Sequence, residues 1–226
     1  MRISRRKALQ AAVGGALAAP YAMRHAAFGA DPIKVVGIHD ASGGLDIYGL
    51  PMIACLEFAV GEVNAAGGLL GREVQLINYD PQSNIQLYTQ FATEAATRDR
   101  AAVVHGGITS ASREAIRPIL RRYSTLYFYN TQYEGGVCDR NCFCTGSTPA
   151  QNVQKLIPHV MQKWGKKLYI LAADYNYGQI TSKWVTKYCR DGGGEVLGAD
   201  FFPLDVTDFG ATIQKIQAAK PDAVVS

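Results

Sequence analysis

The sequence predicts an α/β fold in which parallel strands alternate with the helices that flank them. Short apolar runs alternate with stretches of helical periodicity from residue 32 to residue 226. A composition break at 145–149 (Thr-Gly-Ser-Thr-Pro) interrupts this series, and the alternation restarts after it. With 226 residues and 48% hydrophobic content, the chain can bury one large core or two modest ones.

Residues 1–30 are predicted to form an export signal. Arg5 and Arg6 precede the short apolar stretch Ala8–Ala19, a pattern similar to a twin-arginine signal. A general secretory signal and an amphipathic helix of a cytosolic protein are the alternatives. We expect cleavage before Asp31, and a mature form without a membrane span, because the apolar stretch is too short for one.

The charge of the chain does not indicate a nucleic-acid partner. The formal charge of +4 comes from 23 basic and 19 acidic residues. Five of the basic residues lie within 1–30, where no acidic residue occurs, so 23 − 5 leaves 18 basic residues against 19 acidic ones in the body. The body is therefore nearly neutral, and no basic surface for nucleic acid is predicted.

The first βαβ unit is predicted from its apolar pattern and its glycines. Pro32–His39 is a strand, the helix runs from about residue 48 to residue 64, and Glu73–Tyr79 is the next strand. Gly43 and Gly44 stand between the first strand and the helix but lack the G-x-G-x-x-G spacing of a dinucleotide site. This turn is better read as a loop that covers a crevice at the sheet edge.

The second βαβ unit carries the candidate ligand crevice. The strand 101–105 is followed by a helix that opens with Thr109 and Ser110, and the strand 125–129 runs into Tyr129–Tyr133. Because the carboxyl ends of parallel strands share one edge, these hydroxyl and tyrosine side chains converge there. We find no Lys, His or acid pair among them, which favours a small neutral ligand.

Motifs along the chain resemble a known family. The stretch Asn64–Arg72 (Asn-Ala-Ala-Gly-Gly-Leu-Leu-Gly-Arg), followed by a strand ending at Asp80, resembles the opening of type I periplasmic binding proteins. Thr109–Arg113 and Tyr129–Gly135 resemble the branch that binds urea and short-chain amides. The resemblance covers residues 32–226, and its later motifs are Ala173–Tyr177, Phe202–Phe209 and Ala219–Val224.

The resemblance implies a two-lobed fold, each lobe a parallel sheet flanked by helices. It divides the chain into the export signal 1–30, an N-terminal lobe 31–144 and a second lobe 145–226, with the first crossing at the composition break. Full members of the family continue past this length. We therefore expect a C-terminally truncated fragment with an incomplete second lobe.

The function implied is that of an exported, periplasmic solute-binding component. It would capture urea or a short-chain amide, use no cofactor and present the ligand to an ABC transporter permease. A branched-chain amino-acid-binding protein and an amide-sensing receptor or regulator of the same fold are the alternatives. The export signal argues against a cytosolic sensor.

The resemblance also implies which residues contact the ligand. The positions in the two lobes are Ser110, Tyr129, Thr131, Tyr175 and Tyr177. Tyr129 and Tyr175 would sandwich a planar amide, whose polar edges need partners because an unmet buried group costs about 1–3 kcal/mol. The alternative is that Ser110 only caps a helix and the tyrosines fill a core. Ile108 stands where this branch commonly has a large aromatic residue, so a stacking face is lost there.

An enzyme is the rival class, and the motifs argue against it. Gly107–Ala111 breaks the G-x-S-x-G elbow of serine hydrolases at its last position, and no Glu, Lys and Cys set lies on matching strand ends. His39 and His105 both end strands near the crevice. We expect His105 to be a hydrogen-bonded core residue rather than a ligand or a base.

Five cysteines raise the question of a disulfide. Cys138, Cys142 and Cys144 are close in sequence, and in an oxidising compartment a disulfide is favoured over a metal site. We expect a bond from Cys138 to either Cys142 or Cys144. Cys55 and Cys189 lie in helical patterns, where burial as small hydrophobic residues is the default.

Overall fold

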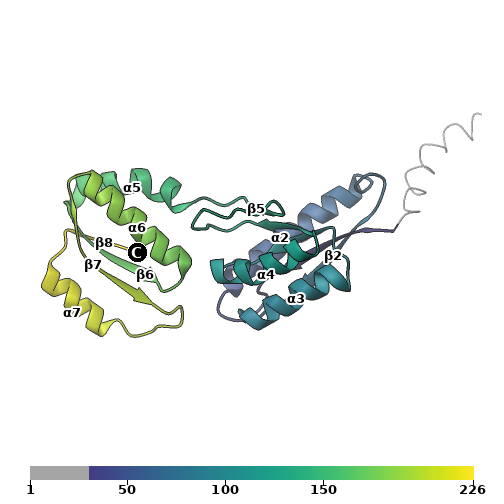
Figure 1. Ribbon diagram of the computed structural model, residues 1–226, viewed down its shortest axis with the longest axis horizontal. Coiled ribbons are helices and arrows are strands. Elements are labelled where there is room, and N and C mark those ends of the chain that lie inside the picture. Colours follow the sequence, from purple (N-terminus) through teal and green to yellow (C-terminus); the bar gives the residue numbers. More distant parts are fainter. Residues whose placement is uncertain (1–30) are drawn as a thin grey trace, which may run out of the picture.

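The computed structural model describes residues 31–226, so the expected export signal lies outside the described residues. Two lobes follow one another along the longest axis of the molecule (Figure 1). Each lobe is a parallel sheet with helices on its faces, which confirms the predicted α/β class.

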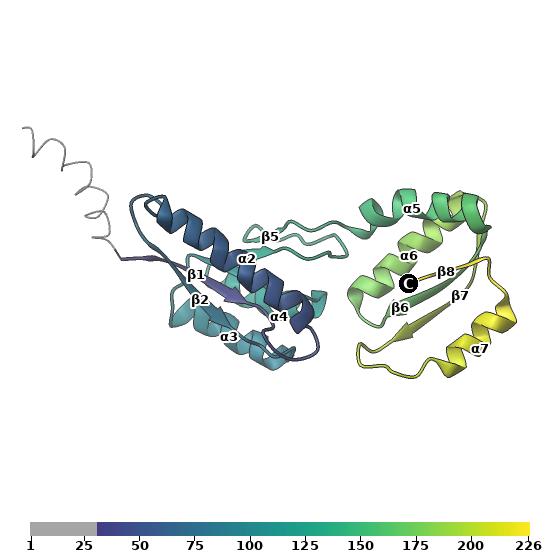
Figure 2. The same ribbon diagram turned by 180° about the vertical axis from the view of Figure 1, so that it is seen from behind.

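The first lobe contains five strands and three helices. In chain order these are β1 (Ile33–Ile38), α2 (Asp46–Ala65), β2 (Val74–Tyr79), α3 (Ile85–Thr97), β3 (Val103–Gly106), α4 (Ser110–Arg122), β4 (Leu126–Tyr129) and β5 (Cys142–Cys144). The strand order is β2-β1-β3-β4-β5, and every neighbouring pair is parallel. Helices α3 and α4 cover the face seen in Figure 1, and α2 covers the opposite face seen in Figure 2.

Capping and burial explain why α4 starts where it does. The side chain of Thr109 accepts a hydrogen bond from the amide of Ser112 (3.1 Å), which satisfies one of the orphan donors of the first turn. Further along the helix, Ile116 and Leu120 are completely buried. They pack in a core with other buried apolar residues of the lobe, including Val36, Ile38, Tyr88, Val104, Tyr127 and Tyr129.

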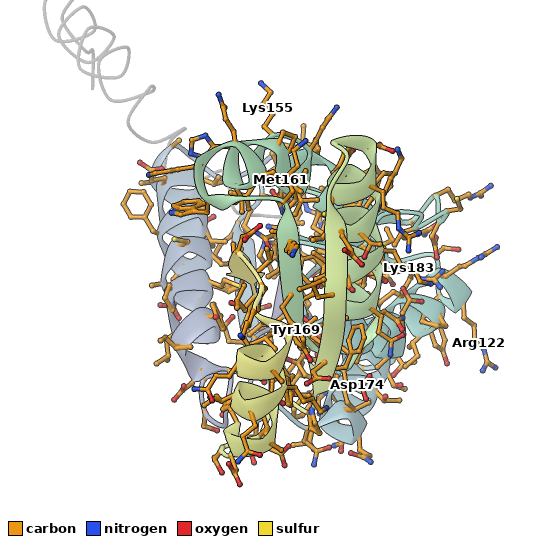
Figure 3. The ribbon with its side chains drawn as sticks, turned by 90° about the vertical axis from the view of Figure 1, so that its left-hand side faces the viewer. Arg122, Lys155, Met161, Tyr169, Asp174 and Lys183 are labelled. Atoms are coloured by element: carbon orange, nitrogen blue, oxygen red, sulfur yellow. The ribbon has the colours of Figure 1, made fainter. Side chains whose placement is uncertain are left out.

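The second lobe is built in the same way on a smaller sheet. Its elements are α5 (Pro149–Trp164), β6 (Lys167–Ala173), α6 (Asn176–Asp191), β7 (Glu195–Phe202), α7 (Gly210–Ala219) and β8 (Ala223–Val225). The strands are parallel in the order β7-β6-β8. Met161 and Tyr169 are buried, whereas Lys155 and Lys183 project outward from α5 and α6 (Figure 3).

A short segment joins the two lobes after β5. Residues 145–148 lead from β5 to α5, and the amide of Tyr133 donates to the carbonyl of Ser147 (3.2 Å). Gly146 passes so close to the first lobe that a Cβ at this position would lie 2.0 Å from the carbonyl oxygen of Thr131. The segment is therefore packed against the loop that follows β4.

The cysteines depart from two expectations. Cys55 is exposed, as is most of α2, in which Gly49 is the only buried residue. The prediction failed because a helical pattern does not by itself show which face of the helix is covered. Cys138 is exposed and unbonded, so the expected disulfide is not formed; Cys142 is held in the sheet, with its sulfur 3.9 Å from that of Cys144. The burial of Cys189 agrees with the prediction.

Candidate functional site

A pocket of about 580 Å³ lies between the lobes. The strands of both lobes point their carboxyl ends toward it, so the loops that follow β1, β3, β4, β6 and β7 surround it (Figures 1 and 2). Its lining is mixed apolar and polar, without a charged side chain: Leu45, Tyr48, Met52, Ile108, Thr109, Asn130, Thr131, Gln132, Tyr175, Tyr177 and Leu204. This position is the sheet edge at which open α/β folds bind ligands.

The first-lobe wall of the pocket is fixed by hydrogen bonds to its backbone. The hydroxyl of Thr131 donates to the carbonyl oxygen of Ile108 (2.8 Å). The hydroxyl oxygen of Ser112 accepts from the amides of Ile108 (3.0 Å) and Thr109 (3.1 Å). These bonds tie the loop after β4 to the start of α4, so the lining residues are held in place before any ligand arrives.

Ser110 and Tyr129 lie beneath this wall and do not line the pocket. Ser110 is 1% exposed, and its hydroxyl donates to Oε2 of Glu134 (2.5 Å). Tyr129 is completely buried, and its hydroxyl donates to the carbonyl oxygens of Ile108 (2.8 Å) and Gln132 (3.3 Å). Tyr129 therefore cannot face Tyr175 across a ligand in this arrangement, and its burial raises the pKa of its phenol to about 12.

A buried ion pair supports the same loop from below. Arg113 is 1% exposed and donates to Oε1 (2.5 Å) and Oε2 (3.2 Å) of Glu134. Its guanidinium also lies 5.0 Å from the ring centre of Tyr129 and 5.8 Å from that of Tyr133. Burial opposes both charges, but hydrogen bonds outweigh it. The bonds of Arg113 to Glu134 and Glu114 raise its pKa, and the bonds of Glu134 to Arg113 and Ser110 lower its pKa.

The second lobe contributes two tyrosines at the start of α6. The rings of Tyr175 and Tyr177 stack with their centres 6.4 Å apart, and both line the pocket. The hydroxyl of Tyr177 donates to Oε1 of Gln132 in the first lobe (2.7 Å). The close packing of this helix on its sheet depends on Gly178, where a Cβ would lie 2.1 Å from the carbonyl oxygen of Ala173.

Two histidines lie behind the lining, linked to Asn130. Nε2 of His39 and Nδ1 of His105 are 2.8 Å apart, and Nε2 of His105 is hydrogen-bonded to the amide of Asn130. His105 is thus hydrogen-bonded as expected. Burial, and then the charge of His105, lowers the pKa of His39 to about 3, while burial also lowers that of His105. Both shifts favour the neutral form of the ring.

Sequence reasoning found part of the lining and missed the rest. Ile108, Thr131, Tyr175 and Tyr177 lie on the pocket, whereas Ser110 and Tyr129 lie under it. It did not single out several lining residues, namely Leu45, Tyr48, Met52, Asn130, Gln132 and Leu204. Asn130 and Gln132 stand inside the Tyr129–Tyr133 stretch that directed attention to this edge, but Leu45, Tyr48 and Met52 come from a turn and helix without a motif of their own.

The described part of the chain has no cluster of a metal-binding kind. Within residues 31–226, no group of three or more His, Cys, Asp or Glu side chains is arranged to hold a metal ion. None of the helices in this range is long and apolar enough to cross a membrane. The lining of the pocket itself offers hydroxyls, carboxamides and apolar faces.

A parallel α/β molecule with a pocket between two lobes has the architecture of a two-lobed binding protein. The chain belongs to the periplasmic binding protein family, whose model matches residues 32–226. Members of this family are substrate-binding proteins rather than enzymes. The family assignment agrees with the resemblance to type I periplasmic binding proteins.

Curated relatives support the family at low identity. The Leu/Ile/Val-binding protein homolog 4 of Brucella abortus is 26% identical over 209 residues, covering 86% of this chain and 50% of the relative. The Leu/Ile/Val-binding protein homolog 7 of Brucella suis is 22% identical over 205 residues, covering 85% of this chain and 51% of the relative. The chain thus spans about half the length of the curated relatives it matches.

Solved structures share the fold. A periplasmic binding protein from Burkholderia mallei superposes with a TM-score of 0.75 at 23% identity, covering 87% of this chain and 54% of that one. A branched-chain amino acid transporter substrate-binding protein from Streptococcus pneumoniae, solved with isoleucine, gives 0.72 at 22% identity and covers 86% and 57%. A solute-binding protein from Rhodopseudomonas palustris, solved with 3,4-dihydroxybenzoic acid, gives 0.76 at 20% and covers 87% and 55%.

Proposed function

We propose that this chain is the exported solute-binding component of an ABC transporter and that its ligand is small and neutral, urea or a short-chain amide. The observation that carries the proposal is the lining of the pocket between the lobes, which has hydroxyls, carboxamides and tyrosine rings but no charged side chain. A neutral planar ligand needs such partners for its polar edges, and its burial does not carry the free-energy cost of an unpaired charge.

The roles within this proposal differ between lining and supporting residues. Thr131, Gln132 and Tyr175 offer polar groups to the ligand, and Ile108 offers an apolar face. Ser110 and Tyr129 act from beneath, by holding Glu134 and the carbonyl of Ile108 in place. Closure of the second lobe brings Tyr175 and Tyr177 over the ligand, so both lobes contribute to its binding free energy.

A branched-chain amino acid is the second candidate, favoured by a specific feature of the pocket. Leu45, Met52, Ile108 and Leu204 form apolar lining, and about 580 Å³ is roomy enough for an aliphatic side chain. The relatives named as Leu/Ile/Val-binding protein homologs and the structure solved with isoleucine point the same way. Against it, none of the lining residues is acidic, so the ammonium group would have no charged partner.

Calorimetric titration separates these candidates. The protein is titrated in turn with urea, acetamide, formamide, leucine and isoleucine at neutral pH. Saturable heat with urea or an amide, and none with the amino acids, is the expected result. Binding of leucine or isoleucine alone replaces the first candidate with the second.

A pair of matched variants tests the location of the site. Tyr175→Ala is expected to weaken ligand binding by about 1–3 kcal/mol, because it removes an aromatic face of the pocket. Tyr123 is an exposed tyrosine at the C-terminal end of α4, the end opposite to the one that lines the pocket. Tyr123→Ala therefore serves as the control and should bind the ligand like the parent protein. Equal affinity of both variants and the parent contradicts the assignment of this pocket.

A further inference from the structure

One hydrogen bond spans the pocket from lobe to lobe. The hydroxyl of Tyr177, at the start of α6, donates to Oε1 of Gln132, in the loop after β4, over 2.7 Å. Among residues 31–226 no other side-chain hydrogen bond or ion pair joins 31–144 to 149–226. Both partners also line the pocket, so this bond lies at the wall of the space that a ligand would occupy.

Each partner is held by its own lobe. The backbone carbonyl of Gln132 accepts from the buried Tyr129, and the neighbouring Thr131 is bonded to Ile108. On the other side, the carbonyl of Tyr177 accepts from the hydroxyl of Thr181 (2.6 Å), and its ring stacks on Tyr175. The bond therefore connects two segments whose backbones are each held by their own lobe.

We propose that Gln132 is a positioning residue for ligand capture, and that its bond to Tyr177 is a latch that holds the two lobes in the arrangement seen here. This inference rests on the proposed binding function but concerns the protein before ligand arrives. If a ligand binds only the latched arrangement, its apparent affinity equals its intrinsic affinity multiplied by the fraction of molecules in that arrangement. The latch raises that fraction separately from any contact that Gln132 and Tyr177 make with the ligand.

The latch also orients the carboxamide of Gln132. Because its oxygen accepts from Tyr177, its N–H donors are left for the pocket. Gln132→Glu keeps an oxygen acceptor for Tyr177 but loses these donors. Tyr177→Phe keeps the aromatic face but loses the latch. The two substitutions therefore separate the two roles of the pair.

Small-angle X-ray scattering of the ligand-free chain tests the latch directly. Tyr177→Phe, Gln132→Ala and the double variant should each expand the protein by the same amount, because each removes the same single bond. Gln132→Glu should resemble the parent protein. Tyr188→Phe is the control, since Tyr188 lies on the same helix but stacks on Trp184. Unchanged dimensions in Tyr177→Phe and Gln132→Ala, or additive expansion in the double variant, overturn the latch.

Titration with acetamide and with leucine then tests the consequence. For whichever of these probes the parent protein binds, Tyr177→Phe should weaken apparent affinity about three- to tenfold, the worth of one exposed hydrogen bond. If both bind, the two losses should be equal, and a loss confined to one probe contradicts a latch that acts before binding. If neither binds, the proposed ligands fail, while the scattering result still decides the latch.

Discussion

The two lobes present the pocket in different ways. The first lobe holds its wall with polar groups from beneath: Arg113, Ser110 and Tyr129 are buried, and Glu134, which bonds to Arg113 and Ser110, is partly buried. The second lobe presents Tyr175 and Tyr177 directly, at the start of a helix that packs on its sheet without a buried ion pair in the described residues.

This difference separates residues that shape the site from residues that face the ligand. In the first lobe, a substitution near the pocket acts mainly on folding, because the polar groups involved are buried. In the second lobe, a substitution at the tyrosines acts mainly on binding, because their rings are partly exposed. The comparison is tested most sharply by changes whose effect on stability and on binding can be measured separately.

The largest effect is expected from breaking the buried ion pair. Arg113→Ala leaves the carboxylate of Glu134 without its cation and should lower the free energy of unfolding by about 3–5 kcal/mol. Arg121 lies exposed in the last turn of the same helix, and Arg121→Ala should change stability by less than about 0.5 kcal/mol. Guanidinium chloride denaturation followed by circular dichroism measures both. Equal midpoints for the two variants would show that the pair does not stabilise the first lobe.

Some parts of this arrangement could be predicted from the residue types in the sequence, and others could not. The alternation of strands and helices, the parallel sheets and the edge that carries the pocket follow from apolar periodicity and chain order. Tyr175 and Thr131 could be placed near that edge because they follow β6 and β4 directly. Whether a residue lines the pocket or is buried beneath it was not predictable in the same way.

Tyr129 shows why burial escaped prediction. It is the last residue of β4, and alternation along a strand decides whether such a side chain points into the core or out of it. The sequence Tyr-Phe-Tyr is apolar at every position, so it carries no alternation from which to choose. Ser110 was ambiguous for a related reason, since its partner Glu134 is 24 residues away and no local pattern announces the contact.

The next effect concerns the helix that presents the tyrosines. Gly178→Ala places a methyl group against the carbonyl oxygen of Ala173 and should shift the start of α6, with a loss of stability of about 1–3 kcal/mol. Gly44→Ala, at a turn where nothing lies within 4 Å of the new methyl group, is the matched control. If thermal unfolding of the two variants coincides, the close packing of α6 on β6 does not fix the position of Tyr175 and Tyr177.

A smaller effect should appear as the pH is lowered. The pKa of His39 is about 3 in the folded protein against an ordinary value of 6.5, so the folded state favours the neutral ring. Its stabilising contribution is complete above pH 6.5 and is lost as the pH falls toward 3. Between pH 7 and pH 5 this loss amounts to about 2 kcal/mol.

Replacing His39 should remove that pH dependence. The stability of His39→Asn, measured by guanidinium chloride denaturation at pH 7 and pH 5, is expected to change less between the two values than that of the parent protein. The exposed His159 of α5 gives the control variant His159→Asn, which should keep the parental pH dependence. The prediction is wrong if His39→Asn and the parent lose the same stability on acidification.

The smallest effect compares one hydroxyl in each lobe. Tyr129→Phe removes the donor to the carbonyls of Ile108 and Gln132 and should lower the free energy of unfolding by about 1 kcal/mol, the usual worth of such a bond. Tyr175→Phe removes a hydroxyl at the surface of the pocket and should leave stability within about 0.5 kcal/mol of the parent. For binding, the order should reverse: Tyr175→Phe alters the affinity for the bound amide directly, whereas Tyr129→Phe acts only through the position of the lining loop. If the first lobe shapes the site and the second lobe faces the ligand, Tyr129→Phe has the larger effect on unfolding and Tyr175→Phe has the larger effect on ligand affinity. If the same variant has the larger effect in both measurements, this division between the lobes does not exist.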